Sequence, residues 1–255
     1  MKKIIAVLLC QFFSILTAIG LNLPNSAIQN ATNNLTLLHR EPANFMQNPA
    51  SYSEGVQTSV SFLYNISEIP YYSLNLNKKN FAFALINLGS SPYQENRAAA
   101  GYSYAYGNLR TGVNLKILYV RIDNYNTIST FLVDTAIAWE IENFVTSIAL
   151  QNVNQARYKG KKLPVTLIWE SSWQVTSQGI LSVGIEKQRD FEFSSRLGVS
   201  YKALNSLKLI SSYQYEPNRI GAGVVFTKKK WKISYSVRTH QYLDLTHFIS
   251  LSYGF

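Results

Sequence analysis

The chain has 255 residues, a formal net charge of +10 and only 15% charged residues, and it contains 17 tyrosines, 13 phenylalanines and 4 tryptophans. A soluble domain usually carries about 25% charged residues, whereas low charge with a mean hydropathy of −0.04 fits a barrel with an apolar outside and a polar inside. Nothing beyond the N-terminus approaches the roughly 20 apolar residues of a membrane helix, and no basic run exceeds Lys228–Lys230, which argues against a nucleic-acid partner.

The N-terminus has the organisation of a secretory signal peptide. A lysine pair opens the chain, residues 4–19 are mostly apolar, and Ala18-Ile19-Gly20 fits the small-x-small cleavage pattern. We expect a signal peptide over residues 1–20. A membrane anchor is the alternative, but the apolar core is short for a span. A lipoprotein is disfavoured because Leu9, directly before Cys10, is too bulky. Cleavage would leave a mature chain without cysteine, and therefore without a disulfide or a cysteine-based zinc site.

Residues 21–56 form a separate N-terminal segment in this interpretation. They are rich in asparagine and do not alternate, and they carry Asn48-Pro49-Ala50 shortly before the first alternating run. Pro49 lacks an amide donor and has a fixed φ, and Ala50 is small enough for tight packing. The simplest reading is that Asn48-Pro49 ends a loop before the first strand.

From residue 57 to residue 255 the chain alternates between apolar residues and small or polar ones, which is the period of a β-strand. In one run, for example, Val113 and Leu115 alternate with Gly112 and Asn114. The pattern predicts an all-β fold, a transmembrane outer-membrane β-barrel of about 14 antiparallel strands, and an even count is usual for bacterial barrels. The runs are 57–65, 72–77, 81–86, 100–106, 109–119, 131–140, 144–150, 165–173, 181–186, 196–202, 207–215, 220–227, 231–238 and 245–255.

The connections alternate in length, as they do in barrels with short periplasmic turns and longer outer loops. We expect short turns at 77–80, 106–108, 140–143, 203–206 and 228–230, and longer loops at 89–96, 122–126, 152–164, 187–190, 215–218 and 240–244. A soluble β-sandwich would also explain the period, but not the glycine-rich polar face or the terminal phenylalanine.

The last strand is the most informative run. Its outward residues should contact lipid and serve as the barrel-assembly signal, and it should pair with both 231–240 and 57–65 to close the barrel. These outward residues are Ile249, Leu251, Tyr253 and Phe255.

Basic residues dominate the predicted lumen. Ordinary lumen lining is one explanation, and a ring of cations that selects anions or binds carboxylates is the sharper one. The outer loop at 155–162 is also basic and could meet lipopolysaccharide phosphates. The predicted lumen-facing basic residues are Arg110, Lys116, Arg196, Lys202, Lys208, Lys232 and Arg238.

The sequence gives little support for catalysis. His39, His240 and His247 are the only histidines, and no Gly-x-Ser-x-Gly elbow is present. A hydrolase needs a base held against a nucleophile and oriented by a third group, and three scattered histidines are poor metal ligands. We therefore expect no enzyme activity, no metal and no cofactor.

Short motifs resemble one outer-membrane family. Leu21 to Ala27 (L-N-L-P-N-S-A) and then Gln47 to Ser51 (Q-N-P-A-S) look like the opening of PorV/PorQ-type proteins, which are similar to FadL-type transporters. Residues 149–153 followed by Leu163-Pro164 resemble the central element of that family, although Asn154 stands where a glycine is usual. The resemblance is closest to the PorQ branch. It implies a barrel whose N-terminal segment is a small plug in the lumen, with Asn48-Pro49-Ala50 belonging to that plug.

Two functions follow from this resemblance. The PorQ-like one is a non-enzymatic accessory or docking platform for type IX secretion and cell-surface attachment, with secretion and attachment proteins as partners. The FadL-like one is a transporter of hydrophobic small molecules, which needs an apolar lumen. A simple anion-leaning pore is a third. The inward residues are largely Ser, Gly, Ala and Lys, which favours the platform. Other expected partners are outer-membrane lipid, lipopolysaccharide and the barrel-assembly machinery.

Overall fold

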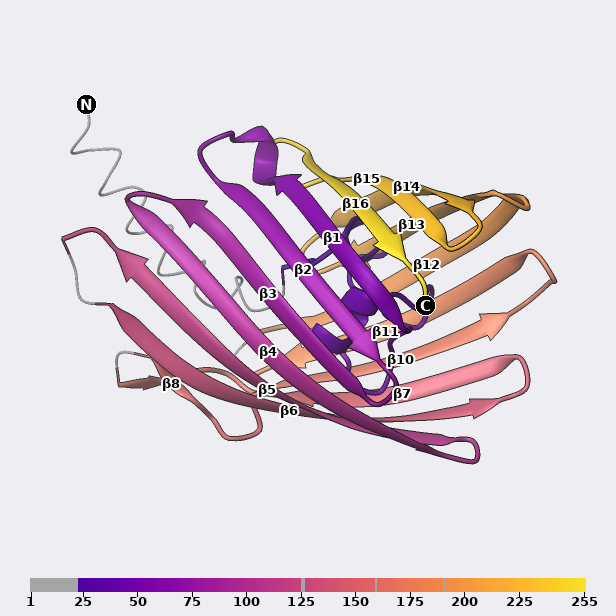
Figure 1. Cartoon of the computed structure of the whole chain (residues 1–255), viewed down its shortest axis with the longest axis horizontal. Helices are drawn as coiled ribbons and strands as arrows, with labels where there is room; N and C mark the ends of the chain where they lie inside the picture. The colour runs from indigo at the N-terminus through magenta and orange to yellow at the C-terminus, as the bar shows by residue number, and fades with distance from the viewer. Residues whose placement is uncertain (1–22, 125–126, 159, 190) are drawn as a thin grey trace.

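The protein is a closed antiparallel β-barrel in a computed structural model that describes residues 23–124, 127–158, 160–189 and 191–255 (Figure 1). The predicted signal peptide lies outside the described residues. No helix among those residues is long and apolar enough to span a membrane.

Fourteen strands form the barrel, as predicted, and each pairs with its neighbours in chain order until β16 closes against β1. The strands are β1 (Gly55–Phe62), β2 (Pro70–Lys78), β3 (Phe81–Ser90), β4 (Tyr93–Tyr106), β5 (Leu109–Ile122), β6 (Ile128–Ile141), β7 (Phe144–Gln151), β10 (Thr166–Gln174), β11 (Gly179–Gln188), β12 (Phe193–Leu204), β13 (Leu207–Tyr215), β14 (Arg219–Lys228), β15 (Trp231–Arg238) and β16 (Thr246–Tyr253).

The alternation in the sequence becomes the two faces of the wall. In β5, Val113, Leu115 and Ile117 are exposed on the outside, whereas Asn114 and Lys116 are buried inside. Such period-two burial repeats along most strands because successive side chains point to opposite faces of a sheet. Some lumen-facing positions are apolar and all of these are buried, namely Leu63, Ile86, Leu118, Ile168, Ile210, Val225 and Phe248.

The two ends of the barrel differ. We call the end with the β2–β3, β4–β5 and β14–β15 connections and Phe255 the turn end, and the opposite end the loop end. The longest connection at the loop end carries a small hairpin of β8 (Arg157–Tyr158) and β9 (Lys161–Lys162). The predicted loop at 89–96 is wrong. Pairing continues to Ser90 opposite Tyr93, because the polar residues in this stretch occupy strand positions rather than a loop.

The closing strand has the predicted partners. β16 pairs with β15 from Trp231 opposite Tyr253, and with β1 from Val56 opposite Tyr253. The first strand ends earlier than predicted: residues 63–65 form a short 3₁₀ turn (η3, Leu63–Asn65), in which Tyr64 has a φ of 57°. Three of the four residues assigned to the assembly signal are exposed on the outside and Tyr253 is half-buried. The four are Ile249, Leu251, Tyr253 and Phe255.

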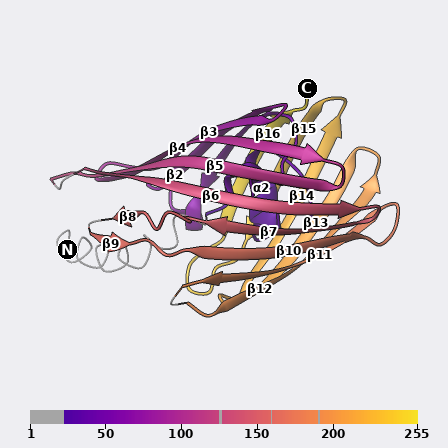
Figure 2. The ribbon, with the colours of Figure 1, turned by 90° about the horizontal axis from the view of Figure 1, so that it is seen from below.

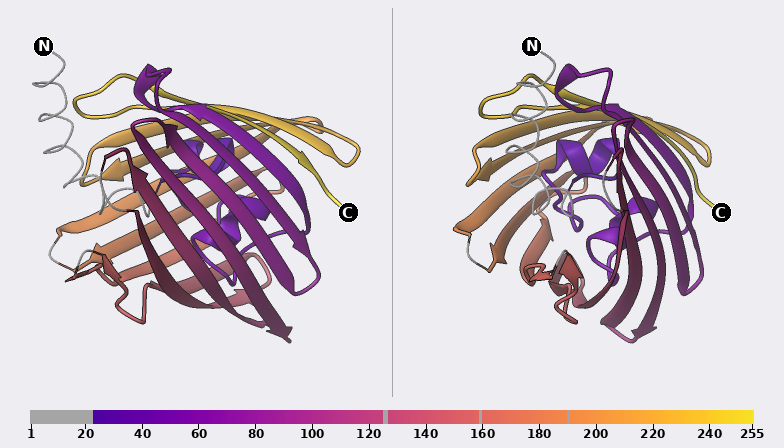
Figure 3. Two further views of the ribbon diagram at one scale, coloured as in Figure 1. Left: turned by 60° about the vertical axis from the view of Figure 1, so that its left-hand side comes forward. Right: turned by 90° about the vertical axis from the view of Figure 1, so that its left-hand side faces the viewer.

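Residues 23–54 lie inside the barrel, and we call them the plug (Figures 2 and 3). The plug contains one short helix, α2 (Ala27–Ala31), and one 3₁₀ helix, η2 (Pro42–Met46). Ser26 is the N-cap of α2, and its hydroxyl accepts a hydrogen bond from the Gln29 amide, which satisfies a backbone donor at the helix start. Nearly every plug residue is buried, so the lumen is the core of this protein.

Candidate functional site: the plug and the wall around it

The helix α2 is seated directly on the wall of β13–β16. The Ala27 amide donates to the Ser250 hydroxyl at 2.8 Å, and the Asn30 side-chain amide donates to the Ser236 hydroxyl at 3.0 Å. A side chain at Gly221 would collide with the Ala31 carbonyl. Glycine is therefore needed where the helix backbone meets this wall.

A carboxylate on the opposite wall holds the middle of the plug. Glu170 of β10 is 1% exposed. It accepts hydrogen bonds from the Thr36 amide at 2.9 Å, the Thr36 hydroxyl at 2.8 Å and the Leu37 amide at 3.1 Å. Because losing any of these bonds would leave a buried polar group unsatisfied, Glu170 fixes this turn of the plug.

Asn48, Pro49 and Ala50 lie in the plug, against the wall of β5–β7. The Asn48 amide donates to the Ser147 hydroxyl at 3.0 Å, and its carbonyl oxygen accepts from the Ala50 amide at 3.1 Å. A side chain at Gly112 would collide with the Pro49 carbonyl. Ala50 packs in an apolar cluster with Ala136, Ala138, Ala149 and Ile168.

The 3₁₀ helix η2 is bound through its carbonyls to β5. The Asn114 side-chain amide donates to the Phe45 carbonyl, and the Lys116 ammonium donates to the Met46 carbonyl at 2.5 Å. Lys116 also pairs with Asp134 of β6. This charge therefore serves plug binding rather than a solvated channel lining.

The predicted basic residues separate into groups by position. Lys116 lies in the middle of the lumen. Arg196 and Arg238 lie toward the loop end, where both are buried. The remaining four lie toward the turn end, where Lys202 is directly opposite Lys208; these four are Arg110, Lys202, Lys208 and Lys232.

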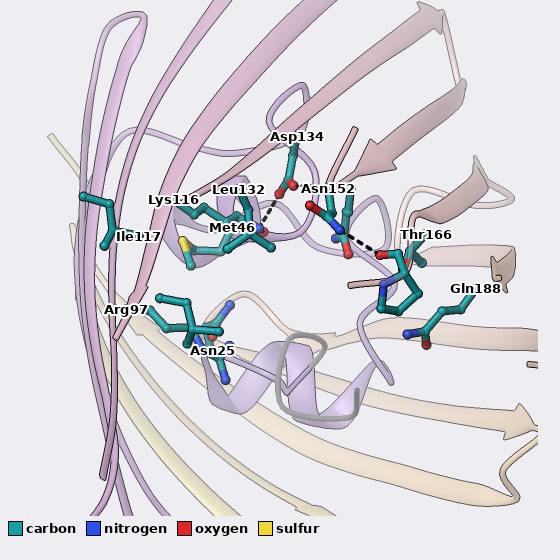
Figure 4. A pocket seen from close by; sticks show the side chains of 13 residues that line it. Asn25, Met46, Arg97, Lys116, Ile117, Leu132, Asp134, Asn152, Thr166 and Gln188 are labelled. Carbon is teal, nitrogen blue, oxygen red and sulfur yellow. Dashed lines mark hydrogen bonds and ion pairs between the residues drawn. The ribbon is translucent and has the colours of Figure 1, made fainter. Parts of the chain in front are cut away.

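Two internal spaces lie beside the plug, and the one facing Met46 is very small. A cavity of about 20 Å³ lies between Met46 and the wall of β4–β7, and Arg97, Lys116 and Asp134 point into it (Figure 4). This volume suits about one water molecule. A second hollow of about 140 Å³ lies at the turn end, beside Ala50, Arg40 and Arg110. The plug segment 46–50 therefore has free space on both sides.

The outside of the same wall carries an apolar groove. It has a volume of about 460 Å³, lies over Ala98, and is bordered by Tyr72, Leu85 and Tyr119. Arg97 and Ile117 border both the internal cavity and this groove. The two hollows are thus back to back across β4 and β5, where Arg97 pairs with Leu118.

Two titratable plug residues, the buried Glu41 and the partly buried His39, lie two positions apart in the sequence. The Glu41 carboxylate accepts hydrogen bonds from the Ser26 hydroxyl and, at 2.6 Å, from the Gln57 amide. Burial nevertheless raises the pKa of Glu41 to about 7. Burial, and then the charges of Lys208 and Lys232, hold the pKa of His39 well below its usual value. His39 is therefore neutral, and its Nδ1 accepts a hydrogen bond from Lys208 at 3.1 Å, since an ammonium has only donors.

The three histidines lie in different parts of the barrel. His39 contacts Lys208 within the plug region, His240 packs edge-to-face on Tyr64 at the loop end, and His247 lies on the outer face beside Tyr235. Within the described part of the chain, no group of three metal-ligating side chains comes together.

Several solved hydrocarbon transporters and channels have a similar fold. The barrel is similar to the Pseudomonas putida toluene transporter TodX, with a TM-score of 0.64 and 11% identity over 90% of this chain and 98% of that one. The Ralstonia pickettii toluene transporter TbuX gives a TM-score of 0.63 and 11% identity over 84% and 94%. The CymD monoaromatic hydrocarbon channel gives 0.62 and 10% over 92% and 98%. No protein-family model and no curated protein sequence matches the chain.

These likenesses show the fold alone, a closed barrel of the outer-membrane type. The finer resemblance to the PorQ branch stays a prediction. The expectation of a non-enzymatic barrel also stays a prediction.

Sequence reasoning missed three residues of the interior. Arg219 falls between the predicted loop at 215–218 and the predicted strand at 220–227, but it is the first residue of β14 and lies on the lumen side. Glu41 and Glu170 were not recognised as plug anchors. A single acidic residue gives no local signal of the distant groups it will bind, so only Arg219 could have been found, by extending the alternation of 220–227 by one residue.

Proposed function

We propose that the protein is an outer-membrane channel for small hydrophobic molecules of monoaromatic size, closed by its plug in the state described here. The fold it shares with toluene transporters supports this proposal. The observation that carries it is the pair of hollows on the two faces of the β4–β5 wall, which share Arg97 and Ile117.

The groove gives an apolar molecule a favourable exit. Transfer of apolar surface out of water is worth about 25 cal/mol per Å², so a molecule leaving the lumen would be drawn toward a lipid-facing groove rather than back into water. The wall at this point has small side chains, Ala98, Ala99 and Ala100, in the middle of β4. Passage requires the plug segment 46–50 to shift, because the cavity of about 20 Å³ is too small for an aromatic ring.

Uptake in cells tests this function. The protein would be expressed in a Gram-negative host without hydrophobic channels of its own, and entry of radiolabelled toluene would be compared with entry of a polar sugar of similar mass. We expect faster toluene entry and unchanged sugar entry. Equal toluene entry with and without the folded barrel would contradict the proposal.

A second function is favoured by the packed lumen. A barrel filled by its own plug can act as a docking platform without passing any substrate, and this fits the accessory role in type IX secretion and surface attachment. Gene deletion followed by surface proteomics addresses it: loss of displayed cargo with normal toluene entry would favour the platform. An open anion-selective pore is disfavoured, because it requires a water-filled lumen.

A further inference from the structure

Three arginines meet in the lumen near the loop end. Arg196 of β12 is opposite Gln214, which is opposite Arg219 of β14. Gly221, two residues after Arg219, is opposite Arg238 of β15. All three arginines occupy lumen-facing positions, and Arg196 and Arg238 are 6% and 4% exposed. We call these residues the arginine cluster.

The cluster has more positive charge than its surroundings neutralise. Glu186 pairs with Arg196, and it is the carboxylate of the cluster among the described residues. The charges of Arg219 and Arg196 act on Arg238, and no described carboxylate pairs with Arg238. The Nε atoms of Arg196 and Arg219 are also buried without a hydrogen-bond partner in the described part of the chain.

Such an arrangement is costly unless something binds to it. Buried charges in proteins are normally paired, because removing a charge from water is expensive. Three arginines and one glutamate leave a net charge of +2. A phosphate group, with a charge of about −1.5 to −2 near neutral pH, matches this excess better than a carboxylate, and the guanidinium fork suits its oxygens.

The arginine cluster has the plug on one side and loop-end residues on the other. Below the cluster, Asn33 of the plug donates to the Arg219 carbonyl at 3.5 Å and to the Ser212 hydroxyl at 2.9 Å. Above it, Tyr64 and His240 are in edge-to-face contact from two different loops, with ring centroids 4.9 Å apart. The cluster therefore lies between the plug on one side and the loop-end residues Tyr64 and His240 on the other.

We propose that the arginine cluster is a binding site for a phosphate group, held by Arg196, Arg219 and Arg238 beneath the Tyr64–His240 contact. This site is independent of the channel function, since it lies on β12–β15, away from the wall of β4–β5. The phosphate belongs either to a free anion or to the headgroup of a phosphorylated lipid.

The test uses the full-length folded barrel in detergent and measures urea unfolding by tryptophan fluorescence. Inorganic phosphate is compared with sodium chloride and sodium acetate at equal ionic strength, and lipid A is compared with dephosphorylated lipid A. We expect phosphate-dependent stabilisation. Protection by inorganic phosphate identifies a free anion as sufficient, whereas protection by lipid A alone identifies the lipid headgroup. No protection by either, or equal protection by acetate, would overturn the proposal.

The variant Arg238→Gln removes one of the three guanidinium groups. The control is Arg110→Gln, because Arg110 is a lumen-facing arginine at the opposite end of the barrel. We expect R238Q to weaken the apparent phosphate affinity about tenfold or more, and R110Q to leave it unchanged. Without phosphate, R238Q should be at least as stable as the parent, because it removes one of three mutually repelling charges. A loss of stability that is the same with and without phosphate would show that Arg238 is structural and would overturn the site.

Discussion

The plug meets two walls of the barrel in different ways. On β13–β16, α2 lies against Gly221 and Gly223 with its backbone in direct contact, and serine hydroxyls bind it. On β4–β7, the plug segment 46–50 has a hollow on each side, and the wall behind one of these hollows carries the apolar groove. Close packing resists movement and free volume permits it.

This difference identifies the part of the plug that would move in the proposed channel. The α2 side is a fixed seat, and the segment 46–50 is the part that can shift toward the hollow at the turn end and widen the cavity. The hydrogen bonds at Asn114, Lys116 and Asn48 would then be the ones exchanged during opening.

The largest effect is expected at the fixed seat. Gly221→Val places a side chain where the Ala31 carbonyl lies, so it should lower the free energy of unfolding by about 3 kcal/mol, at the upper end for overpacked cores. Ala222→Val is the control, because Ala222 is on the other face of the same strand. Urea unfolding measures both. Equal midpoints for the two variants would show that α2 is not seated on this wall.

The stability of the protein should depend on pH through Glu41, which accepts hydrogen bonds from Ser26 and Gln57. The pKa of Glu41 is raised from 4.5 to about 7, so the stability it contributes is complete below pH 4.5 and is lost as the pH rises to about 7. Glu41→Gln stays neutral and should gain up to about 3 kcal/mol relative to the parent between pH 4 and pH 8. A difference between the two proteins that is constant with pH would show that Glu41 ionises normally.

The apolar groove over Ala98 should control the exit of toluene from the lumen. Ala98→Trp fills the groove, whereas Ala100→Trp places the same ring on the same strand and face but outside the groove. We expect A98W to slow toluene entry about tenfold, equivalent to about 1.4 kcal/mol, with unchanged stability, and A100W to leave entry unchanged. If both variants transport like the parent, the groove is not on the route.

The smallest effect is expected at the moving segment. Asn48→Ala removes its hydrogen bonds to Ser147 and to the Ala50 amide, so it should cost about 1 kcal/mol. Because the variant destabilises the closed position of the plug segment 46–50, toluene entry should rise severalfold. Slower entry in N48A would indicate that Asn48 holds the open form instead.

Parts of this structure were predictable because their signals are local. The outward faces of the strands follow a period of two, and the terminal strand fixed the closing pair. Other features depend on residues far apart in the sequence. Thr36 and Glu170 are 134 positions apart, so the local sequence around either residue does not predict their contact. The end of β3 was missed because Gly89, Ser90 and Pro92 are turn-forming residues that hide the continued pairing. Alternation predicts which cations face the lumen, but their separation into groups along the barrel depends on the stagger of the strands.

The account is tested most directly by locking the moving segment. Asn48→Cys with Ser147→Cys replaces two side chains that are 3.0 Å apart, in a chain whose only cysteine, Cys10, is in the predicted signal peptide. The control is Asn30→Cys with Ser236→Cys, a second asparagine–serine pair whose side chains are hydrogen-bonded at 3.0 Å, on the α2 side of the plug. Toluene entry is measured with the pair oxidised and then reduced. The account predicts that the Asn48–Ser147 lock stops entry, that reduction restores it, and that the lock on the α2 side has no effect. Unchanged entry with the Asn48–Ser147 lock fully formed would contradict it.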